Sequence, residues 1–576
     1  MVTPASFPEL SFEAGLPGLL ERAAAFFPER GIAVFDGRGR SHERRTYPEL
    51  LRCARATAGK WSALGVLPGD RILVALPTSW AWLEAWLGAV LCGALPVAVA
   101  PGAALGAGLA HLQKVELLLE RLGGRFVVVG DAFRREAEAA GLPRASAAAI
   151  TATELAGVAP AAVRAPSPSG GEIAFLQLTS GSTGLPRAVQ IPHAAALHNA
   201  WASDRAIGAP HGRPTHQYAD AMVSWLPLHH DMGLIGCLFL SIFAGHNLWL
   251  FQGSTFLARP RLWLEHLGRH GVAFAPAPNF GYQLCLERLA AEERQGLELA
   301  GWSDAMSGAE MVRPETVQDF CRAFAPVGFR PEAFRPCYGL AEATLALTFD
   351  QEGRGARTLP LPNAAGQGYA LSEVVCCGRP IDDTRIVVRG PNGESLAEGE
   401  IGEVTAAGPG IFTGYWNDPE ATAEGLRHGF LHTGDLGFLK NGELYLTGRL
   451  KDILILRGNN LMPHEIEWIA EEVVGGGGAL RSGAFSVARG ADGEEAVLVV
   501  ETSERDPDQL SQLASEIRGR VGRSLSLTLA EVKFVRRGKI PKTTSGKVQR
   551  RQLRALYLEG ALGDGGDDGP PGEPGT

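Results

Sequence analysis

The sequence lacks three features that would each point to a particular class of protein. It has no excess of positive charge, because its 576 residues carry a formal net charge of −9, and a surface that binds nucleic acid needs concentrated lysine and arginine. None of its 8 cysteines stands at the CxxC spacing of a zinc or redox site. Its N-terminus has no basic start followed by an apolar core, as a secretory signal has. We therefore expect no nucleic-acid partner, no zinc or redox centre and no export.

Uninterrupted apolar runs of membrane-spanning length are also missing. The two longest candidates are Trp80–Pro101, which contains Glu84, and Met232–Phe251, which contains several glycines and His246. Each is predicted to be a buried helix that runs into a buried strand. The sequence thus predicts no transmembrane segment and a cytoplasmic protein.

What is present is a repeated alternation of helix-like and strand-like segments from about residue 15 to residue 450. Short apolar runs such as RILVAL (71–76), RFVVVG (125–130) and IAFLQL (173–178) separate stretches of helical periodicity. This order is typical of an α/β fold in which helices cover mainly parallel β-sheets. The length is too great for one compact domain.

The pattern changes at GRLKD (448–452), where we expect a hinge. A smaller α+β unit follows, with strand-like runs EAVLVVET and AEVKFV and a helix near 508–521. The last residues, GDGGDDGPPGEPGT, have almost nothing to bury. The predicted division is an N-terminal domain (1–450), a mobile C-terminal domain (451–562) and a disordered tail (563–576).

A Gly- and hydroxyl-rich loop, LTSGSTGLPRAV (178–189), directly follows the strand-like run IAFLQL. Small residues let a backbone turn sharply and bring N–H groups close to an anion, and hydroxyl groups add donors. The spacing is neither that of the P-loop NTPases nor GxGxxG, and by composition alone such a string is commonly a surface turn. The candidate phosphate-binding residues are Thr179, Ser180, Gly181, Ser182, Thr183, Gly184 and Arg187.

The string TSGSTGLPR resembles the phosphate loop of the adenylate-forming superfamily, which includes acyl-CoA synthetases, luciferases and adenylation domains. Arg187-Ala188 replaces the usual Lys-Gly but keeps the cation. Further strings resemble that superfamily in order: SWLPLHHDMGLIG (224–236), APAPNF (275–280), SGAE (307–310), YGLAEATL (338–345), HTGDLGFL (432–439), GRLKDILILRGNNLMPHEIE (448–467) and PKTTSGKVQR (541–550). The strings around His230 and Asn279 are most similar to those of fatty acyl-AMP ligases.

The resemblance implies that the chain activates a fatty acid with ATP and Mg²⁺ to give acyl-AMP and pyrophosphate. Lys547 would bridge the attacking carboxylate and the adenylate, and Arg449 would contact the ribose or α-phosphate. Glu342, with Thr183, would hold Mg²⁺. His230 would gate the carboxylate site, although a His in this position can equally be an interior imidazole.

The same resemblance implies where the nucleotide lies. Asp435 would accept both ribose hydroxyls, and Tyr338 would lie on the adenine with the SGAE backbone opposite. The full set of implied nucleotide residues, beyond the phosphate loop, is Ser307, Gly308, Ala309, Glu310, Tyr338, Gly339, Thr344, Asp435, Arg449 and Lys547. An apolar acyl tunnel is expected among Met222, Met232, Ile235, Phe274, Phe280 and Tyr282.

The acceptor of the acyl group is left with two alternatives. Fatty acyl-AMP ligases carry an extra segment after YGLAEATL and pass the acyl group to an acyl carrier protein, or to a carrier domain of a polyketide or peptide synthetase. Residues 351–375 stand in that position, but the segment is shorter than usual. Acyl-CoA synthetases use CoA instead. A nucleotide-binding pseudoenzyme would lack Lys547, Glu342 or Asp435, and all three are present.

Overall fold

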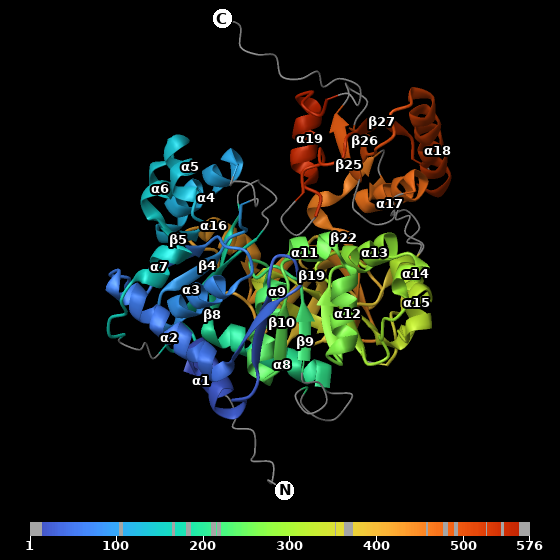
Figure 1. Cartoon of the computed structure of the whole chain (residues 1–576). Helices are drawn as coiled ribbons and strands as arrows, with labels where there is room; N and C mark the ends of the chain where they lie inside the picture. The colour runs from blue at the N-terminus through green and yellow to red at the C-terminus, as the bar shows by residue number, and fades with distance from the viewer. Residues whose placement is uncertain are drawn as a thin grey trace, which may run out of the picture.

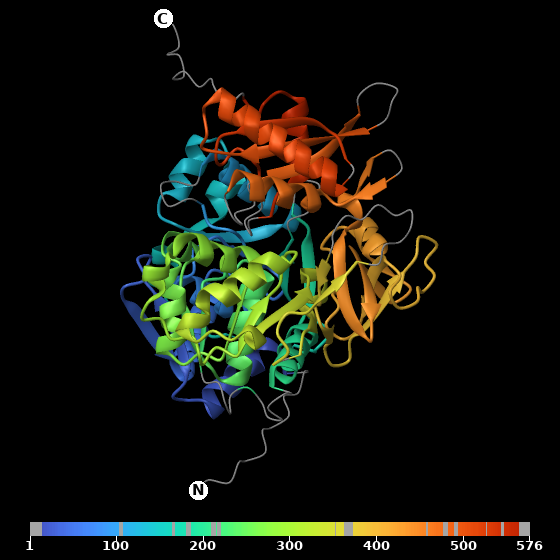
Figure 2. The same cartoon turned by 90° about the vertical axis from the view of Figure 1, so that its right-hand side faces the viewer.

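The computed structural model of the chain describes residues 14–102, 108–163, 168–179, 186–208, 215, 221–351, 353–361, 373–456, 459–475, 482–488, 494–525, 527–542 and 547–563, and all structural statements below refer to them. A large body of helix-covered sheets carries a smaller α+β body at one end, orange to red in Figures 1 and 2. The fold is therefore α/β with a small additional unit, as the sequence predicts.

One sheet of the large body has the strand order β6-β5-β3-β4-β7-β8, with all pairs parallel except β7–β8. Its strands are β3 (Arg71–Val74), β4 (Leu95–Ala98), β5 (Gly124–Val129), β6 (Ala149–Thr151), β7 (Ile173–Leu178) and β8 (Ala188–Pro192). Parallel neighbours need crossover helices, and short apolar strands suit a sheet that is covered on both faces. The helices are α2 (Tyr47–Ala63), α3 (Trp80–Leu91), α4 (Leu109–Leu122), α5 (Phe133–Ala139), α6 (Pro143–Ala148) and α7 (Ala152–Gly157).

Two further sheets have the orders β2-β1-β10-β9 and β11-β12-β13-β14-β17. Their strands are β1 (Gly31–Phe35), β2 (His42–Thr46), β9 (Ala221–Ser224), β10 (Asn247–Leu250), β11 (Phe274–Ala277), β12 (Asp304–Ser307), β13 (Phe334–Gly339), β14 (Ala346–Phe349) and β17 (Arg379–Pro380). The pairs β11–β12 and β12–β13 are parallel, so their carboxyl ends meet at one edge. Ligands of such sheets bind beyond the carboxyl ends of the strands.

Helices complete this part of the large body. They are α1 (Gly15–Phe26), α8 (His193–Gly208), α9 (Asp231–Gly233), the π-helix η4 (Leu234–Phe239), α10 (Leu240–Ala244), α11 (Gly253–Ala258), α12 (Arg261–Arg269), α13 (Asn279–Arg288), α14 (Ala291–Arg294) and α15 (Pro314–Phe324). Short 3₁₀ turns are η5 (Ala325–Val327), η6 (Pro331–Ala333) and η7 (Ala341–Ala343). A continuous apolar core joins these helices to the sheets.

A third lobe of the large body is mainly antiparallel and lies to the right in Figure 2. It contains β18 (Arg385–Arg389), β19 (Gly402–Ala407), α16 (Pro419–Gly425), β20 (Leu426–Arg427), β21 (Phe430–Lys440) and β22 (Glu443–Arg449). The hairpin β21–β22 sets Asp435 opposite Arg449. The 3₁₀ turn η8 (Leu450–Asp452) follows at once, so the hairpin leads from the site directly into the predicted hinge.

The segment after β14 is fastened to this third lobe. Its described ends pair as β15 (Thr358–Pro360) and β16 (Glu373–Val375). Between β14 and β15, Arg357 donates to Asp350 at 2.6 Å and to Glu443 at 2.6 and 3.0 Å. Since Asp350 and Glu443 are both buried, these charge-assisted bonds fix the start of the segment against β22.

The small body has its own apolar clusters. It consists of β23 (Leu454–Leu456), β24 (Asn459–Leu461), α17 (Pro463–Val474), β25 (Ser482–Ala488), β26 (Glu494–Glu501), α18 (Pro507–Leu525), β27 (Leu529–Val535) and α19 (Arg550–Leu558). The strand-like runs and the helix predicted after residue 452 correspond to β26, β27 and α18. Residues 564–576 of the predicted tail lie outside the described residues.

Both long apolar stretches are interior elements of the large body. Trp80–Pro101 contains α3 and β4, and Met232–Phe251 contains η4, α10 and β10, which agrees with a buried helix running into a buried strand. Over the part of the chain that the structure describes, no helix combines the length and apolar character needed to cross a bilayer.

Candidate active site

A cavity of about 2380 Å³ lies where the large and small bodies meet. Its walls come from the carboxyl ends of β4, β7, β9, β11, β12 and β13, from the β21–β22 hairpin, and from Lys542 and residues 547–552 of the small body. A pocket for one small ligand measures about 300–1,000 Å³. The cavity is therefore large enough for a nucleotide together with a second substrate.

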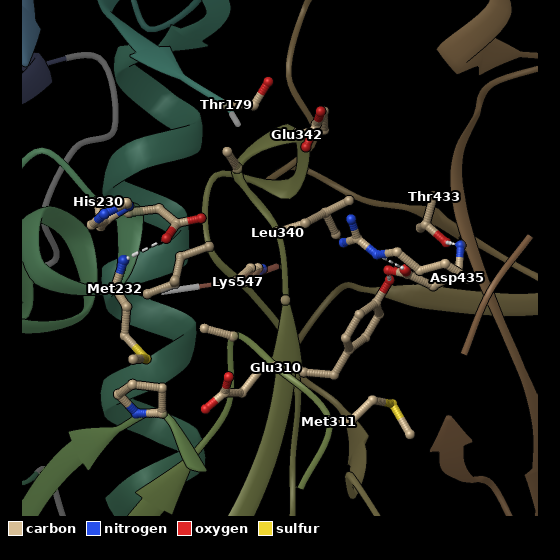
Figure 3. Close-up of a pocket in the computed structure, with 18 of the residues that line it drawn as sticks. Thr179, His230, Met232, Glu310, Met311, Leu340, Glu342, Thr433, Asp435 and Lys547 are labelled. Carbon is tan, nitrogen blue, oxygen red and sulfur yellow. Dashed lines mark hydrogen bonds and ion pairs between the residues drawn. The ribbon is translucent and has the colours of Figure 1, made fainter. Parts of the chain in front are cut away.

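One side of the cavity joins an aromatic ring to an ion pair in which Asp435 is buried and Arg449 is exposed. Asp435 accepts a hydrogen bond from the Tyr338 hydroxyl at 2.7 Å and pairs with Arg449 Nε at 2.8 Å (Figure 3). The Thr433 hydroxyl accepts from the Asp435 backbone N–H at 3.0 Å. Burial raises the pKa of Tyr338 well above its usual value, and the Asp435 charge raises the pKa of Arg449. The group is thus a neutral phenol, a carboxylate and a permanent cation.

The backbone near Tyr338 is shaped by tight contacts that exclude larger side chains. A Cβ on Gly308 would lie 2.8 Å from the Cys337 sulfur, and one on Gly339 would lie 1.8 Å from the Leu345 carbonyl oxygen. Ala309 and Thr344 adopt positive φ angles of 68° and 64°, a conformation that residues other than Gly rarely adopt. Such strain is concentrated at functional sites. Ser307 and Glu310 flank Gly308 and Ala309 at the end of β12, so the SGAE segment lies beside Tyr338, as the sequence predicts.

The predicted phosphate loop joins two antiparallel strands, β7 and β8. Ser180, Gly181, Ser182, Thr183 and Gly184 lie outside the described residues. At its two ends, the Thr179 N–H donates to the Arg187 carbonyl at 2.9 Å, and both residues line the cavity. The Arg187 guanidinium lies 5.1 Å from the Tyr415 ring centroid and 3.8 Å from Asp418.

Glu342 is the carboxylate in the turn after β13, and it faces the cavity. The Tyr415 hydroxyl donates to Glu342 Oε1 at 2.8 Å. Burial raises the pKa of Glu342. A partly buried carboxylate that accepts from a neutral hydroxyl is stabilised in its ionised form by a cation, and Mg²⁺ favours carboxylate oxygens. Glu342 therefore fits the predicted metal ligand, whereas Thr183 is not described.

Lys547 extends from the small body into the middle of the cavity (Figure 3). Burial and the nearby Arg449 cation lower the pKa of Lys547. Three carboxylates lie near enough to oppose that shift, those of Asp231, Asp435 and Glu310. The ammonium thus stands between the Tyr338–Asp435–Arg449 group and the His230–Asp231 wall.

The remaining side of the cavity is partly apolar. Met232, Phe274 and Phe280 line it, together with His229, His230 and Asp231. Burial and the neighbouring His230 lower the pKa of His229, and Gln177 donates to its carbonyl at 3.0 Å. Met222, Ile235 and Tyr282 do not line the cavity, so that part of the tunnel prediction is wrong. They face the core instead, and the Tyr282 hydroxyl donates to the Met306 carbonyl at 2.7 Å.

Sequence reasoning missed one residue of this site, Tyr415, and did not foresee the part played by the side chain of another, Glu310. Tyr415 contacts both Glu342 and Arg187, and the Glu310 carboxylate accepts from the Phe280 N–H at 2.6 Å at the start of α13. Glu310 was expected to contribute its backbone, yet its side chain lines the cavity, and burial raises its pKa to about 7. No residue spacing in the sequence links position 415 to 342, so only the fold reveals that contact.

Comparisons with known proteins agree with this geometry. The profile of the AMP-binding enzyme family matches residues 20–416. The chain belongs to this family. The superfamily resemblance inferred from the motifs is thereby confirmed.

Relatives of this AMP-binding enzyme include three kinds of named protein. A putative acyl-CoA synthetase of Caulobacter vibrioides is 32% identical over 98% of this chain and 99% of its own length. The long-chain-fatty-acid–AMP ligase FadD26 of Mycobacterium marinum is 32% identical over 95% of this chain and 97% of its own. A medium-chain-fatty-acid–[acyl-carrier-protein] ligase, JamA of Moorena producens, is 35% identical over 68% of each chain.

Solved structures show the same architecture. A fatty acyl-adenylate ligase from work on the E. coli and L. pneumophila proteins superposes with a TM-score of 0.85 at 29% identity, covering 96% of this AMP-binding enzyme and 98% of that chain. The fatty acyl-adenylate ligase of L. pneumophila with acyl adenylate and pyrophosphate gives a TM-score of 0.68 at 28% identity, covering 95% and 96%. The large N-terminal and small C-terminal arrangement predicted from the sequence is confirmed.

Proposed function

We propose that this enzyme activates a fatty acid with ATP to form acyl-AMP and pyrophosphate, and then passes the acyl group to the phosphopantetheine thiol of an acyl carrier protein. The observation that carries the first step is the position of Lys547, between a ring–carboxylate–arginine group suited to a nucleoside and a wall of apolar residues. The named fatty acyl-AMP ligases among the relatives support the same substrate class.

In the first step, a carboxylate oxygen of the fatty acid attacks the α-phosphorus of ATP. A new P–O bond forms, the bond from the α-phosphorus to the bridging oxygen breaks, and pyrophosphate leaves with that electron pair. Two anions must meet, so positioning and positive charge account for most of the rate. Lys547 neutralises the attacking carboxylate and the α-phosphate together, and Arg449 holds the ribose side.

Asp435 and Tyr338 orient the nucleoside. A carboxylate offers about four lone-pair sites, and the Tyr338 hydroxyl and Arg449 use two of them. Two remain for the 2′- and 3′-hydroxyls of the ribose. Tyr338 and the SGAE backbone then enclose the adenine. Glu342, with Thr183, would hold Mg²⁺, which would supply charge that neutralises the phosphate oxygens.

In the second step, a thiolate attacks the acyl carbonyl carbon and AMP leaves. The carrier-protein acceptor is supported by relatives named acyl-carrier-protein ligases in Moorena producens and Teredinibacter turnerae. The segment at 351–375, anchored through Arg357, stands where fatty acyl-AMP ligases carry their extra segment. The second candidate acceptor is CoA, which is favoured by the relative named a putative acyl-CoA synthetase. A cytoplasmic location, a division at residue 450 and a carrier domain of a polyketide or peptide synthetase as partner belong to the same proposal.

One assay series tests both steps. Purified enzyme is given ATP, Mg²⁺ and fatty acids of increasing chain length, and acyl-AMP is trapped as the hydroxamate with hydroxylamine. Hydroxamate that depends on both ATP and fatty acid is expected, and its absence for all chain lengths would contradict the activation step. CoA and a phosphopantetheinylated carrier protein are then offered separately. Rapid acyl-CoA formation without acyl-carrier formation would replace the carrier-protein acceptor with CoA.

A further inference from the structure

Two buried carboxylates one turn apart on α17 hold arginines from the two bodies of the enzyme. Glu467 accepts from Arg550 at 2.6 and 2.7 Å, and Glu471 accepts from Arg313 at 3.1 Å. Residues four apart share one face of a helix, so both acids lie on the same side of α17. Glu467 and Glu471 are 0% and 3% exposed, so removing the arginine from either carboxylate would be costly.

Arg313 is the partner from the large body. It directly precedes α15, and its backbone N–H donates to the Asn279 side-chain oxygen at 3.1 Å, at the start of α13 in the cavity wall. Its guanidinium lies 4.9 Å from the Trp468 ring centroid, and its side chain is only 10% exposed. Arg313 is therefore fixed at its base by the substrate wall and covered at its tip by the small body.

Arg550 is the partner from the small body, and it follows Lys547 by three residues. Besides Glu467, it donates to Asp452 of η8 at 2.9 Å. The two oxygens of Glu471 have different donors. The Ser482 hydroxyl donates to Oε1 at 2.9 Å, and Arg313 donates to Oε2. One helix thus connects the substrate wall, the hinge and the segment that carries Lys547.

We infer that Arg313 and Glu471 form an interdomain latch that holds the small body in the orientation in which Lys547 reaches the site. Both are positioning residues, since neither needs to touch a substrate. The inference rests on the proposed function, because it assigns the latched orientation to the adenylate-forming step. Any large rotation of the small body about η8 separates Arg313 from Glu471 and exposes both to water, where each charge is solvated. The latch therefore favours one orientation without preventing the other.

The test compares the two half-reactions in Arg313→Gln and Glu471→Gln. In the latched orientation, Arg313→Gln removes the arginine from the buried Glu471, which keeps the Ser482 hydroxyl, and Glu471→Gln leaves Arg313 with the longer 3.8 Å pair to Glu472. Either change weakens the latched orientation, so the population of that orientation falls. We expect hydroxamate formation to fall by about tenfold to a hundredfold, and thiol transfer from supplied acyl-AMP to stay within about twofold of wild type. Arg313→Lys, which keeps the charge, should retain most adenylation. The matched control is Arg322→Gln on α15, the helix that Arg313 precedes. It removes an exposed ion pair with Asp319 and should leave both half-reactions unchanged.

Limited proteolysis without substrates tests the latch independently of the proposed reaction. Lys451 is exposed in η8, so trypsin cleavage after Lys451 reports opening of the hinge. Arg313→Gln and Glu471→Gln should be cut several-fold faster there than wild type and Arg322→Gln, at unchanged melting temperature. Equal loss of both half-reactions, or cleavage at the wild-type rate, would overturn the latch. If wild type makes no acyl-AMP, the proposed function fails, and the cleavage rates still decide whether Arg313 and Glu471 hold the two bodies together.

Discussion

Replacing Asp435 by Asn should weaken ATP binding specifically, and the size of the effect follows from counting hydrogen bonds. The carboxylate accepts from the Tyr338 hydroxyl, forms an ion pair with Arg449 and, in the proposed complex, also accepts from two ribose hydroxyls, which makes four interactions. An amide oxygen has two lone pairs, so at least two of the four bonds are lost. A hydrogen bond to a charged group contributes about 1.5–3 kcal/mol, and the neighbouring groups partly compensate for the loss.

We therefore expect the KM for ATP to rise by about 10- to 100-fold in Asp435→Asn, while the KM for the fatty acid changes little. The assay is steady-state hydroxamate formation with each substrate varied in turn. Tyr338→Phe removes one bond of the four and serves as a graded comparison, with a rise of about three- to tenfold. If the KM for ATP in Asp435→Asn stays within twofold of wild type, or both KM values rise together, the reasoning about the ribose is refuted.

Three other outcomes are expected. Lys547→Ala should lower hydroxamate formation by at least about a hundredfold and spare thiol transfer from supplied acyl-AMP, since its ammonium serves only the first step; equal losses would contradict this role. Burial raises the pKa of Glu310 to about 7, so the folded wild-type protein becomes less stable as the pH rises towards that value and the side chain ionises. Glu310→Gln has no such charge, and its free energy of unfolding relative to wild type should therefore increase from pH 5 to pH 8 by up to about 3 kcal/mol, as measured by urea unfolding. A relative stability that does not change with pH would contradict that burial. Arg335→Met should destabilise the large body by about 3–5 kcal/mol, because it leaves Asp304 buried and unpaired, and adding Asp304→Asn should recover part of the loss. No recovery would show that the pair is not what Arg335 stabilises.

The parts of the site that could be predicted are those in which chemistry follows local sequence order. The Tyr338 and Asp435 motifs each stand directly at a strand, and the fold brings the Tyr338 hydroxyl within 2.7 Å of the Asp435 carboxylate. The predicted strand IAFLQL is β7, and its carboxyl end leads to the expected loop. Short continuous apolar runs were sufficient here because these strands are buried on both faces.

The parts that could not be predicted depend on contacts between distant segments. Apolar residues near the motifs gave a tunnel list in which Phe274 and Met232 line the cavity but Tyr282 lies in the core, because apolar side chains fill walls and interiors equally well. The pairing of Arg313 with Glu471 spans 158 positions in the chain. No local pattern encodes such a contact, since it depends on how two bodies dock.

In the proposed reaction cycle, the β21–β22 hairpin would couple the departure of AMP to the freedom of the predicted hinge. Asp435 and Arg449 face each other across its two strands, and Arg449 is the last residue before η8. A nucleotide held by this pair would stabilise the end of the strand that leads into the small body. In the proposed cycle, loss of AMP after acyl transfer would remove that support, so emptying the site would itself free the small body for the next cycle.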